Sequence, residues 1–234
     1  MNYGLDSRAV RELAPQDLLG RLNRCERKHA PDALYVAGDA ELLRTGRRVS
    51  IIGSRKASAN SIKRARKLAK ALVARDITVV SGLASGIDTA AHSAAMEHGG
   101  RTVAVLGTPL NVVYPRTNDA LLREIIASHA AVSQFRWGTP THRRNFPMRN
   151  RTMALLSDAT VIVTAGERSG TVHQGREALR LGRDLLLMAS LAAKGLAWAQ
   201  ALQSHGAEVL TDRNLESWLN SLAGRVRVDE PSLA

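Results

Sequence analysis

The chain has 234 residues, of which 44% are hydrophobic and 23% are charged, a composition typical of folded globular proteins that excludes disordered and fibrous classes. Its single cysteine, Cys25, excludes an internal disulfide and a zinc site made of cysteines, so we expect a reducing, cytoplasmic setting and no bound metal. The longest apolar run, 185–193, covers about half of the roughly 20 residues that a membrane span needs, so we predict no transmembrane helix. The net charge of +12 favours a polyanionic partner.

The two ends of the chain differ in composition from its middle. Residues 1–30 are polar and charged, and a helix start at Ala14-Pro15-Gln16-Asp17 predicts a short helical extension that is too small to form a domain. Residues 223–234 have no periodicity and contain Asp-Glu-Pro-Ser, so we expect a flexible tail. One folded domain, residues 31–222, is left between them.

Within residues 31–222, short runs of valine, isoleucine and leucine alternate with segments of helical periodicity. We predict strands at 49–52, 77–80, 102–106, 131–133, 160–164, 184–188 and 208–210. We predict helices at 59–74, 88–97, 118–128, 150–157, 172–181, 195–204 and 214–222. This alternation is typical of βαβ units and predicts an α/β fold with a mostly parallel sheet.

The excess of positive charge is concentrated in two windows that contain no acid. Residues 44–75 carry eleven arginines and lysines, and residues 125–157 carry five arginines and two histidines. Lysines and arginines that merely coat solvated helix faces would also produce such windows. One polyanion can contact both windows only if the fold brings them to one surface. Among polyanions, we favour nucleic acid as the partner.

Three loops of small residues each follow a predicted strand and precede a predicted helix. They are Gly53-Ser54-Arg55, the run from Ser81 to Gly86, and Ser169-Gly170-Thr171. In an open parallel sheet such loops meet at the carboxyl edge, where helix N-termini attract anions. Tight turns alone would explain any one of these loops, but three of them beside the basic windows favour an anion site.

The segment from Asn145 to Arg151 breaks a rule of helix composition. Arg149 and Arg151 fall in the first turns of a predicted helix, where cations interact unfavourably with the helix dipole. An external anion or a buried carboxylate held by these arginines would explain the exception.

Common enzyme and nucleotide-binding signatures do not occur in the sequence. It has no G-x-x-x-x-G-K-[ST], G-x-G-x-x-G, HExxH, CxxC or G-x-S-x-G motif. His92 lies one turn after Asp88 on an alanine-rich segment, and we interpret it as a packed histidine rather than a base. We therefore predict no catalytic residue and no cofactor.

Several motifs in one order resemble the DNA-processing protein A (DprA/Smf) family. They are VSIIGSR at 49–55, VVSGLASGIDTAAH at 79–92, the turn at 114–118, NFPMRNR at 145–151 and SGT at 169–171. The resemblance covers about residues 33–219. It implies an extended Rossmann-like fold with helices on both faces of the sheet, single-stranded DNA binding, a homodimer and contact with the RecA recombinase in DNA uptake or recombination.

The resemblance and the small-residue loops together define the predicted DNA- and phosphate-binding site. Its residues are Gly53, Ser54, Arg55, Lys56, Ser81, Gly82, Ser85, Gly86, Asn145, Arg149, Asn150, Arg151, Ser169, Gly170 and Thr171. Aromatic residues make up only 3% of the chain, so we expect electrostatic binding with Phe146 or Trp137 stacking on one base.

The sequence also departs from the family it resembles. Ser85 stands where many relatives carry arginine, and 172–175 replaces a more usual Leu-x-Thr-Ala. Since 234 residues leave little room beside this domain, we expect the chain to lack the helical N-terminal domain and the winged-helix C-terminal domain that many members carry.

Two other functions stay open at this point. The first is a nucleotide-binding sensor or a nucleoside-monophosphate-processing protein, because the fold resembles that of the phosphoribohydrolases. The enzyme branch carries Pro-Gly-Gly-x-Gly-Thr, whereas this chain has Thr164-Ala165-Gly166-Glu167-Arg168-Ser169-Gly170-Thr171. The second is an architectural protein that lays its basic helix on an acidic partner.

Overall fold

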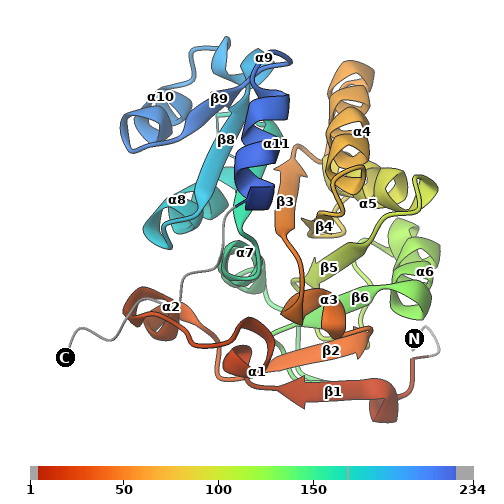
Figure 1. The fold of residues 1–234 in the computed structure, drawn as a ribbon. Helices are drawn as coiled ribbons and strands as arrows, with labels where there is room; N and C mark the ends of the chain where they lie inside the picture. The colour runs from red at the N-terminus through yellow and green to blue at the C-terminus, as the bar shows by residue number, and fades with distance from the viewer. Residues whose placement is uncertain (1–4, 168, 225–234) are drawn as a thin grey trace.

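The computed structural model describes residues 5–167 and 169–224 and contains one nine-stranded sheet (Figure 1). Its strands are β1 (Val10–Leu13), β2 (Leu34–Gly38), β3 (Arg48–Gly53), β4 (Thr78–Ser81), β5 (Thr102–Leu106), β6 (Ala130–Ser133), β7 (Ala159–Thr164), β8 (Asp184–Met188) and β9 (Glu208–Leu210). They lie in the order β1-β2-β6-β5-β4-β3-β7-β8-β9. The seven strands from β6 to β9 in this order pair in parallel, and β1 and β2 extend the sheet as an antiparallel edge beside β6.

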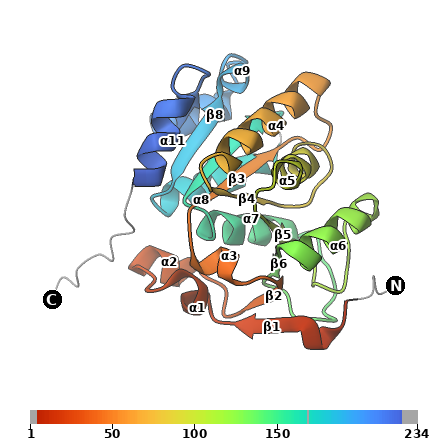
Figure 2. The same cartoon turned by 45° about the vertical axis from the view of Figure 1, so that its right-hand side comes forward.

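Helices cover both faces of the sheet (Figure 2). The long helices on one face are α4 (Ala59–Val73), α5 (Ile87–Glu97), α6 (Asp119–Ser128) and α11 (Leu215–Gly224), and those on the other are α7 (Asn145–Leu155), α8 (Thr171–Arg180) and α10 (Ala197–Ser204). The short helices are η1 (Ser7–Ala9), α1 (Pro15–Leu19), α2 (Arg24–His29), α3 (Glu41–Arg44), η2 (Arg116–Asn118) and α9 (Ala189–Ala192). The fold is therefore the predicted Rossmann-like one.

The central strands are buried on both faces, as parallel strands covered by helices must be. Successive side chains of a strand point to opposite faces, so β3 sends Val49 and Ile51 toward α4 and α5 and sends Ile52 toward the opposite layer. Two buried residues of β3 are polar, Arg48 and Ser50, and Arg48 donates from Nε to the carbonyl oxygen of Leu156 over 2.7 Å. Apolar cores on both sides thus fix the position of β3.

The seven predicted strands are confirmed to within one residue at each end, but two further strands were not expected. β1 lies inside residues 1–30, where only helical structure was predicted, and β2 follows directly after that segment. Both are short and pair antiparallel at the edge of the sheet, and in β1 only the two end residues, Val10 and Leu13, are half-buried, while Arg11 and Glu12 are exposed. A four-residue run of mixed polarity carries too weak a periodicity to be recognised from sequence.

The predicted helix start at Asn150 was also wrong, because α7 begins at Asn145. Pro147 therefore lies in the first turn, where a missing N–H costs nothing, and the arginines come one turn later than expected. Of the predicted tail, residues 225–234 lie outside the described residues, and α11 continues to Gly224. Among the helices that the structure describes, none has the length and apolar character required to cross a membrane.

The strand order reverses between β3 and β7. From β3 the chain adds β4, β5 and β6 on one side of the sheet and returns to place β7, β8 and β9 on the other. The loops that follow β3 and β7 consequently diverge, and they leave a crevice outside the carboxyl ends of the two strands. Ligands of open α/β sheets bind at such a crevice.

Candidate nucleic-acid interface

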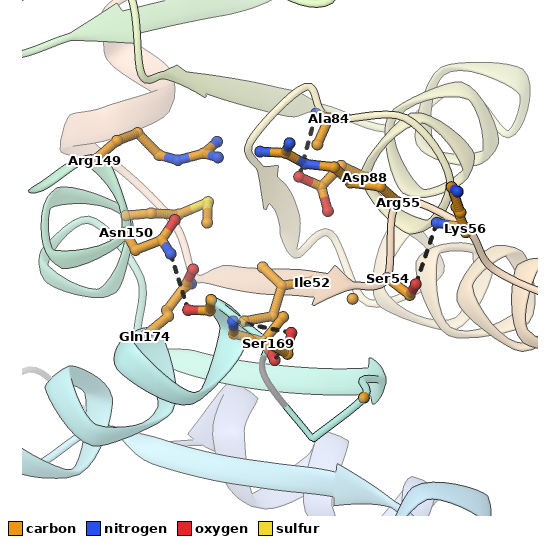
Figure 3. A pocket seen from close by; sticks show the side chains of 15 residues that line it. Ile52, Ser54, Arg55, Lys56, Ala84, Asp88, Arg149, Asn150, Ser169 and Gln174 are labelled. Carbon is orange, nitrogen blue, oxygen red and sulfur yellow. Dashed lines mark hydrogen bonds between the residues drawn. The ribbon is translucent and has the colours of Figure 1, made fainter. Parts of the chain in front are cut away.

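A cavity of about 470 Å³ occupies this crevice (Figure 3). Its lining comes from the loop after β3, the first turn of α5, one face of α7, the loop after β7 and the start of α8. The residues are Ile52, Gly53, Ser54, Arg55, Lys56, Ala84, Asp88, Arg149, Asn150, Met153, Gly166, Ser169, Gly170, Thr171 and Gln174. The two acid-free windows of the sequence therefore do meet, one on each side of this cavity.

The loop after β3 supplies the exposed cations of the cavity. The backbone N–H of Ser54 donates to the carbonyl of Thr164 on β7 over 2.9 Å, and the N–H of Lys56 donates to Oγ of Ser54 over 3.2 Å. These bonds hold the loop close to β7, while the side chains of Arg55 and Lys56 are exposed to solvent. Two exposed cations on a loop held by hydrogen bonds suit a phosphate ligand.

Two glycines allow the β3 loop to pack closely against α5. A Cβ atom on Gly53 would lie 2.6 Å from Cγ1 of Ile87, and a Cβ on Gly86 would lie 2.5 Å from the carbonyl oxygen of Ser54. Gly86 also has a φ of +81°, which side-chain-bearing residues rarely adopt. Gly86 thus supports the position of the cationic loop and does not line the cavity.

The opposite wall is the loop that leads into α8. The hydroxyls of Ser169 and Thr171 lie 2.8 Å apart, and the N–H of Thr171 donates to Oγ of Ser169 over 3.3 Å. Nδ2 of Asn150 donates to the carbonyl of Gly170 over 3.2 Å and ties α7 to this loop (Figure 3). The N-terminus of α8 faces the cavity here, and its dipole favours a negatively charged ligand.

Arg149 lies at the base of the cavity and is only 6% exposed. Its Nη1 donates to the carbonyls of Gly82 over 2.6 Å and of Val105 over 2.9 Å. Burial lowers the pKa of this guanidinium, whereas the nearby carboxylate of Asp88 raises it. Arg149, predicted to contact phosphate, therefore bonds mainly to the protein's own backbone. An external anion and a buried carboxylate were the two explanations for an arginine at this place in the helix, and the structure has a buried carboxylate beside it.

Asp88 is the buried carboxylate beside Arg149. Its Oδ2 accepts hydrogen bonds from the N–H groups of Gly82 and Ala84 over 3.2 and 3.3 Å. Burial raises the pKa of Asp88, and the charge of Arg149 and the two backbone donors act in the opposite direction. Asp88 and Arg149 together hold the loop between β4 and α5. The guanidinium of Arg149 lies so close to Gly82 that a Cβ atom at this position would overlap Nη1.

Six of the predicted site residues do not line the cavity: Ser81, Gly82, Ser85, Gly86, Asn145 and Arg151. Ser81 is buried and donates to the carbonyl of Ile51 over 2.6 Å, and Asn145 is 4% exposed. Arg151 points toward α8, where its Nε lies 3.4 Å from Oε2 of Glu177. Ser81 and Arg151 make these contacts within the protein and Asn145 is buried, so a direct contact of the six residues with a ligand stays a prediction.

Six residues line the cavity but were not in the predicted site: Ile52, Ala84, Asp88, Met153, Gly166 and Gln174. Gln174 is the most deeply buried polar residue among them. It is 1% exposed, and its Nε2 donates to Oγ of Ser50 over 2.8 Å. Gln174 lies three residues after Thr171 on α8, and Met153 lies four residues after Arg149 on α7, spacings that place each pair on one helix face. Helical spacing from the predicted residues was thus the signal that could have identified both.

An aromatic pair lies beside the cationic loop. The rings of Tyr114 and Phe146 have centroids 5.3 Å apart, and the guanidinium carbon of Arg55 lies 5.8 Å from the centroid of Phe146. Tyr114 is 50% exposed and is one of two large hydrophobic side chains that are exposed among the described residues. A flat ring next to a cation is the arrangement that stacks on a nucleobase while holding the adjacent phosphate.

The loops after β3 and β7 thus provide cations, hydroxyls and a helix N-terminus at one crevice, and the rings of Tyr114 and Phe146 lie beside it. Within residues 5–167 and 169–224, no group of three or more histidine, cysteine, aspartate or glutamate side chains is arranged to hold a metal ion. The arrangement can bind an anionic ligand with an attached ring system.

Comparison with known proteins gives the same family at the level of sequence and of structure. The sequence profile of DNA recombination-mediator protein A matches residues 16–221. DNA processing protein DprA of Streptococcus pneumoniae is 36% identical over 183 residues, which make up 78% of this chain and 64% of that protein. The chain spans about a third to two thirds of the length of the curated relatives that it matches.

Two solved structures of this family share the fold. The structure of DprA from Streptococcus pneumoniae superposes with a TM-score of 0.76 at 32% identity, over 89% of this chain and 73% of that one. A structure that addresses the single-stranded DNA binding mode of DNA processing protein A from Helicobacter pylori superposes with a TM-score of 0.78 at 25% identity, over 95% of this chain and 98% of that one. With a profile that matches most of its length, the chain belongs to the DNA recombination-mediator protein A (DprA/Smf) family.

Proposed function

We propose that the chain binds single-stranded DNA at the crevice between β3 and β7 and acts without catalysis in DNA processing and recombination in the cytoplasm. The observation that carries the proposal is the placement of exposed Arg55 and Lys56 opposite the N-terminus of α8 across one cavity. The single-stranded DNA binding of the Helicobacter pylori relative supports the same ligand.

The cavity favours a single strand over a duplex. Its volume of about 470 Å³ is within the range of small-ligand pockets, so it can take one nucleotide unit but not a paired helix. A single strand can turn a base toward Phe146 and place the neighbouring phosphate against Arg55. A base within a duplex is stacked and cannot do so without being flipped out.

Fluorescence anisotropy with a labelled single strand, a matched duplex and mononucleotide competitors tests the proposal. We expect single-strand binding that weakens with salt, with a slope of about −0.7 per phosphate neutralised, and that weakens for Arg55→Ala across all base sequences. Arg24→Ala is the matched control, because Arg24 is an exposed arginine of α2 at the opposite end of the molecule (Figure 1).

A different pattern of binding would assign the cavity to another ligand. If a mononucleotide competed at low concentration while single strands bound no better than duplexes, the site would be that of a nucleotide-binding sensor. Equal affinities of Arg55→Ala and Arg24→Ala for single strands would remove the β3 loop from the interface.

The partners implied by the family resemblance form a second part of the proposal. We propose a homodimer that contacts the RecA recombinase. Light scattering after size-exclusion chromatography measures the first property, and co-sedimentation with RecA filaments on single-stranded DNA measures the second. A monomer at all concentrations, or no co-sedimentation, would refute the respective claim without affecting DNA binding.

A further inference from the structure

A second hollow, which we call the α4 groove, lies between α4, the ends of β8 and β9 and the start of α11. It has a volume of about 460 Å³. Lys63, Arg64 and Lys67 of α4 line one side, and Asp212 lies on the other. None of these residues belongs to the predicted site or lines the first cavity.

The α4 groove carries an excess of positive charge. Nζ of Lys67 lies 2.7 Å from Oδ1 of Asp212, and this hydrogen bond lowers the pKa of the Asp212 carboxyl. Lys63 and Arg64 are exposed and have no acidic side chain within salt-bridge distance among residues 5–167 and 169–224. The charge of Arg64 also lowers the pKa of the Asp212 carboxyl, so one acid faces three cations and the net charge of these four side chains suits an anionic ligand.

The floor of the α4 groove is apolar. Leu68 and Leu210 are buried there, and Met188 and Leu215 are half-buried. Inorganic anions gain nothing from such a floor, whereas a ligand that joins phosphate to a flat ring can bury the ring and leave its phosphate among the cations. The chemistry of the groove is thus that of a nucleotide unit.

The α4 groove and the first cavity open at the same edge of the sheet. β8 ends at Met188 and β9 ends at Leu210, and these two strands follow β3 and β7 in the sheet order. Helix α4 begins three residues after Lys56 and contributes Asn60 and Lys63 to the groove in its first turns. A chain of phosphates that leaves the first cavity past Lys56 meets the cations of α4 next.

We propose that the α4 groove is a second binding site for the same DNA strand, which passes from the first cavity over the N-terminal turns of α4. This inference rests on the proposed function, since it extends the path of the same ligand. A second DNA contact would also give the cations on α4 a function other than solvation of the helix surface.

The test compares Arg64→Ala with Lys70→Ala on short and long oligonucleotides. Arg64 lines the α4 groove, whereas Lys70 is exposed on the same helix outside it, so both variants lose one charge from one helix. Anisotropy is measured at several salt concentrations with thymidine strands of about 4 and about 20 nucleotides, and circular dichroism confirms that each variant is folded.

We expect Arg64→Ala to bind the long strand several-fold more weakly, with a salt slope smaller by about 0.7, and to bind the short strand like the wild type. Lys70→Ala should change neither. Equal effects of the two variants on the long strand would overturn the proposal, as would a loss by Arg64→Ala that is equal for both lengths.

The result for Arg55→Ala separates this proposal from the function it extends. If Arg55→Ala weakens both strands while Arg64→Ala matches Lys70→Ala, the first cavity binds DNA and the groove does not. A different outcome is that a labelled mononucleotide binds the wild type but not Arg64→Ala, while Arg64→Ala binds the long strand as tightly as the wild type does. The groove would then hold a free nucleotide, and the proposed path of the strand would be refuted.

Discussion

The contact between Arg149 and the β4–α5 loop gives a sharp prediction about stability. In Arg149→Met the carbonyls of Gly82 and Val105 lose their donor, and Asp88 stays buried without the positive charge beside it. Removing one partner of a buried charge pair costs about 3–5 kcal/mol. We therefore expect the free energy of unfolding at pH 7 to fall by about this amount, which urea titration followed by circular dichroism measures.

The pH dependence of this loss identifies its cause. The pKa of Asp88 is already raised in the folded protein, and removing Arg149 raises it further. A group whose folded pKa lies above its unfolded value contributes stability below the unfolded pKa and loses it as the pH rises through the folded pKa. The difference between wild type and Arg149→Met should accordingly shrink as the pH falls, because a protonated Asp88 no longer needs the cation.

The double variant Asp88→Asn/Arg149→Met is the control for this reasoning. It removes the buried charge together with its partner, so it should be more stable at pH 7 than Arg149→Met alone. A loss below about 1 kcal/mol in Arg149→Met, or a loss independent of pH, would show that Asp88 and Arg149 are not coupled and would return Arg149 to the list of direct phosphate contacts.

Three further predictions concern the surroundings of the site. Burial lowers the pKa of His92 to about 3, so the unfolded chain binds more protons than the folded one below about pH 6.5. The free energy of unfolding should therefore be about 2 kcal/mol lower at about pH 5 than at pH 7. Urea titrations at these two pH values should show a smaller difference for His92→Gln than for the wild type. Gly86→Ala forces a side chain into a φ of +81° and against Ser54, so thermal unfolding should show a loss of about 1–3 kcal/mol together with weaker single-strand binding. Phe146→Leu keeps an apolar side chain but removes the ring, and we expect a loss of about 1–3 kcal/mol in single-strand binding by anisotropy, whereas unchanged affinity would exclude stacking.

The strands that carry the site were predictable from sequence, and the side chains that line the cavity were predictable only in part. Buried parallel strands such as β7 read as continuous apolar runs with small-residue loops behind them, and both signals are local. By contrast, the orientation of Arg149 depends on Val105 and Gly82, which lie 44 and 67 residues away along the chain. No local pattern distinguishes an arginine whose guanidinium is free to meet a ligand from one whose guanidinium bonds to backbone carbonyls, as that of Arg149 does.

The same limit explains the errors at the N-terminal edge. β1 is a strand because Val10 to Leu13 finds β2 as its partner, and the pairing register runs from Val10 opposite Ala37 to Leu13 opposite Leu34. Arg11 and Glu12 are exposed and only Val10 and Leu13 are half-buried, so burial contributes little and the backbone hydrogen bonds of the ladder contribute most. Such a strand is defined by its neighbour, and the neighbour is known only from the structure.

Asp88 shows how the site can favour an anionic ligand although it contains a carboxylate. A charged Asp88 in the open cavity would repel phosphate, but the side chain is 4% exposed, and its charge is offset by Arg149 and by the backbone donors of Gly82 and Ala84. In the proposed function, an incoming phosphate meets the outer layer, where Arg55 and Lys56 are exposed. The buried pair positions the loops, and the exposed pair provides the attraction. The arrangement would fail if the two pairs changed places. A buried Lys56 would lose its hydration without a partner, and an exposed Asp88 would offset the charge of one cation.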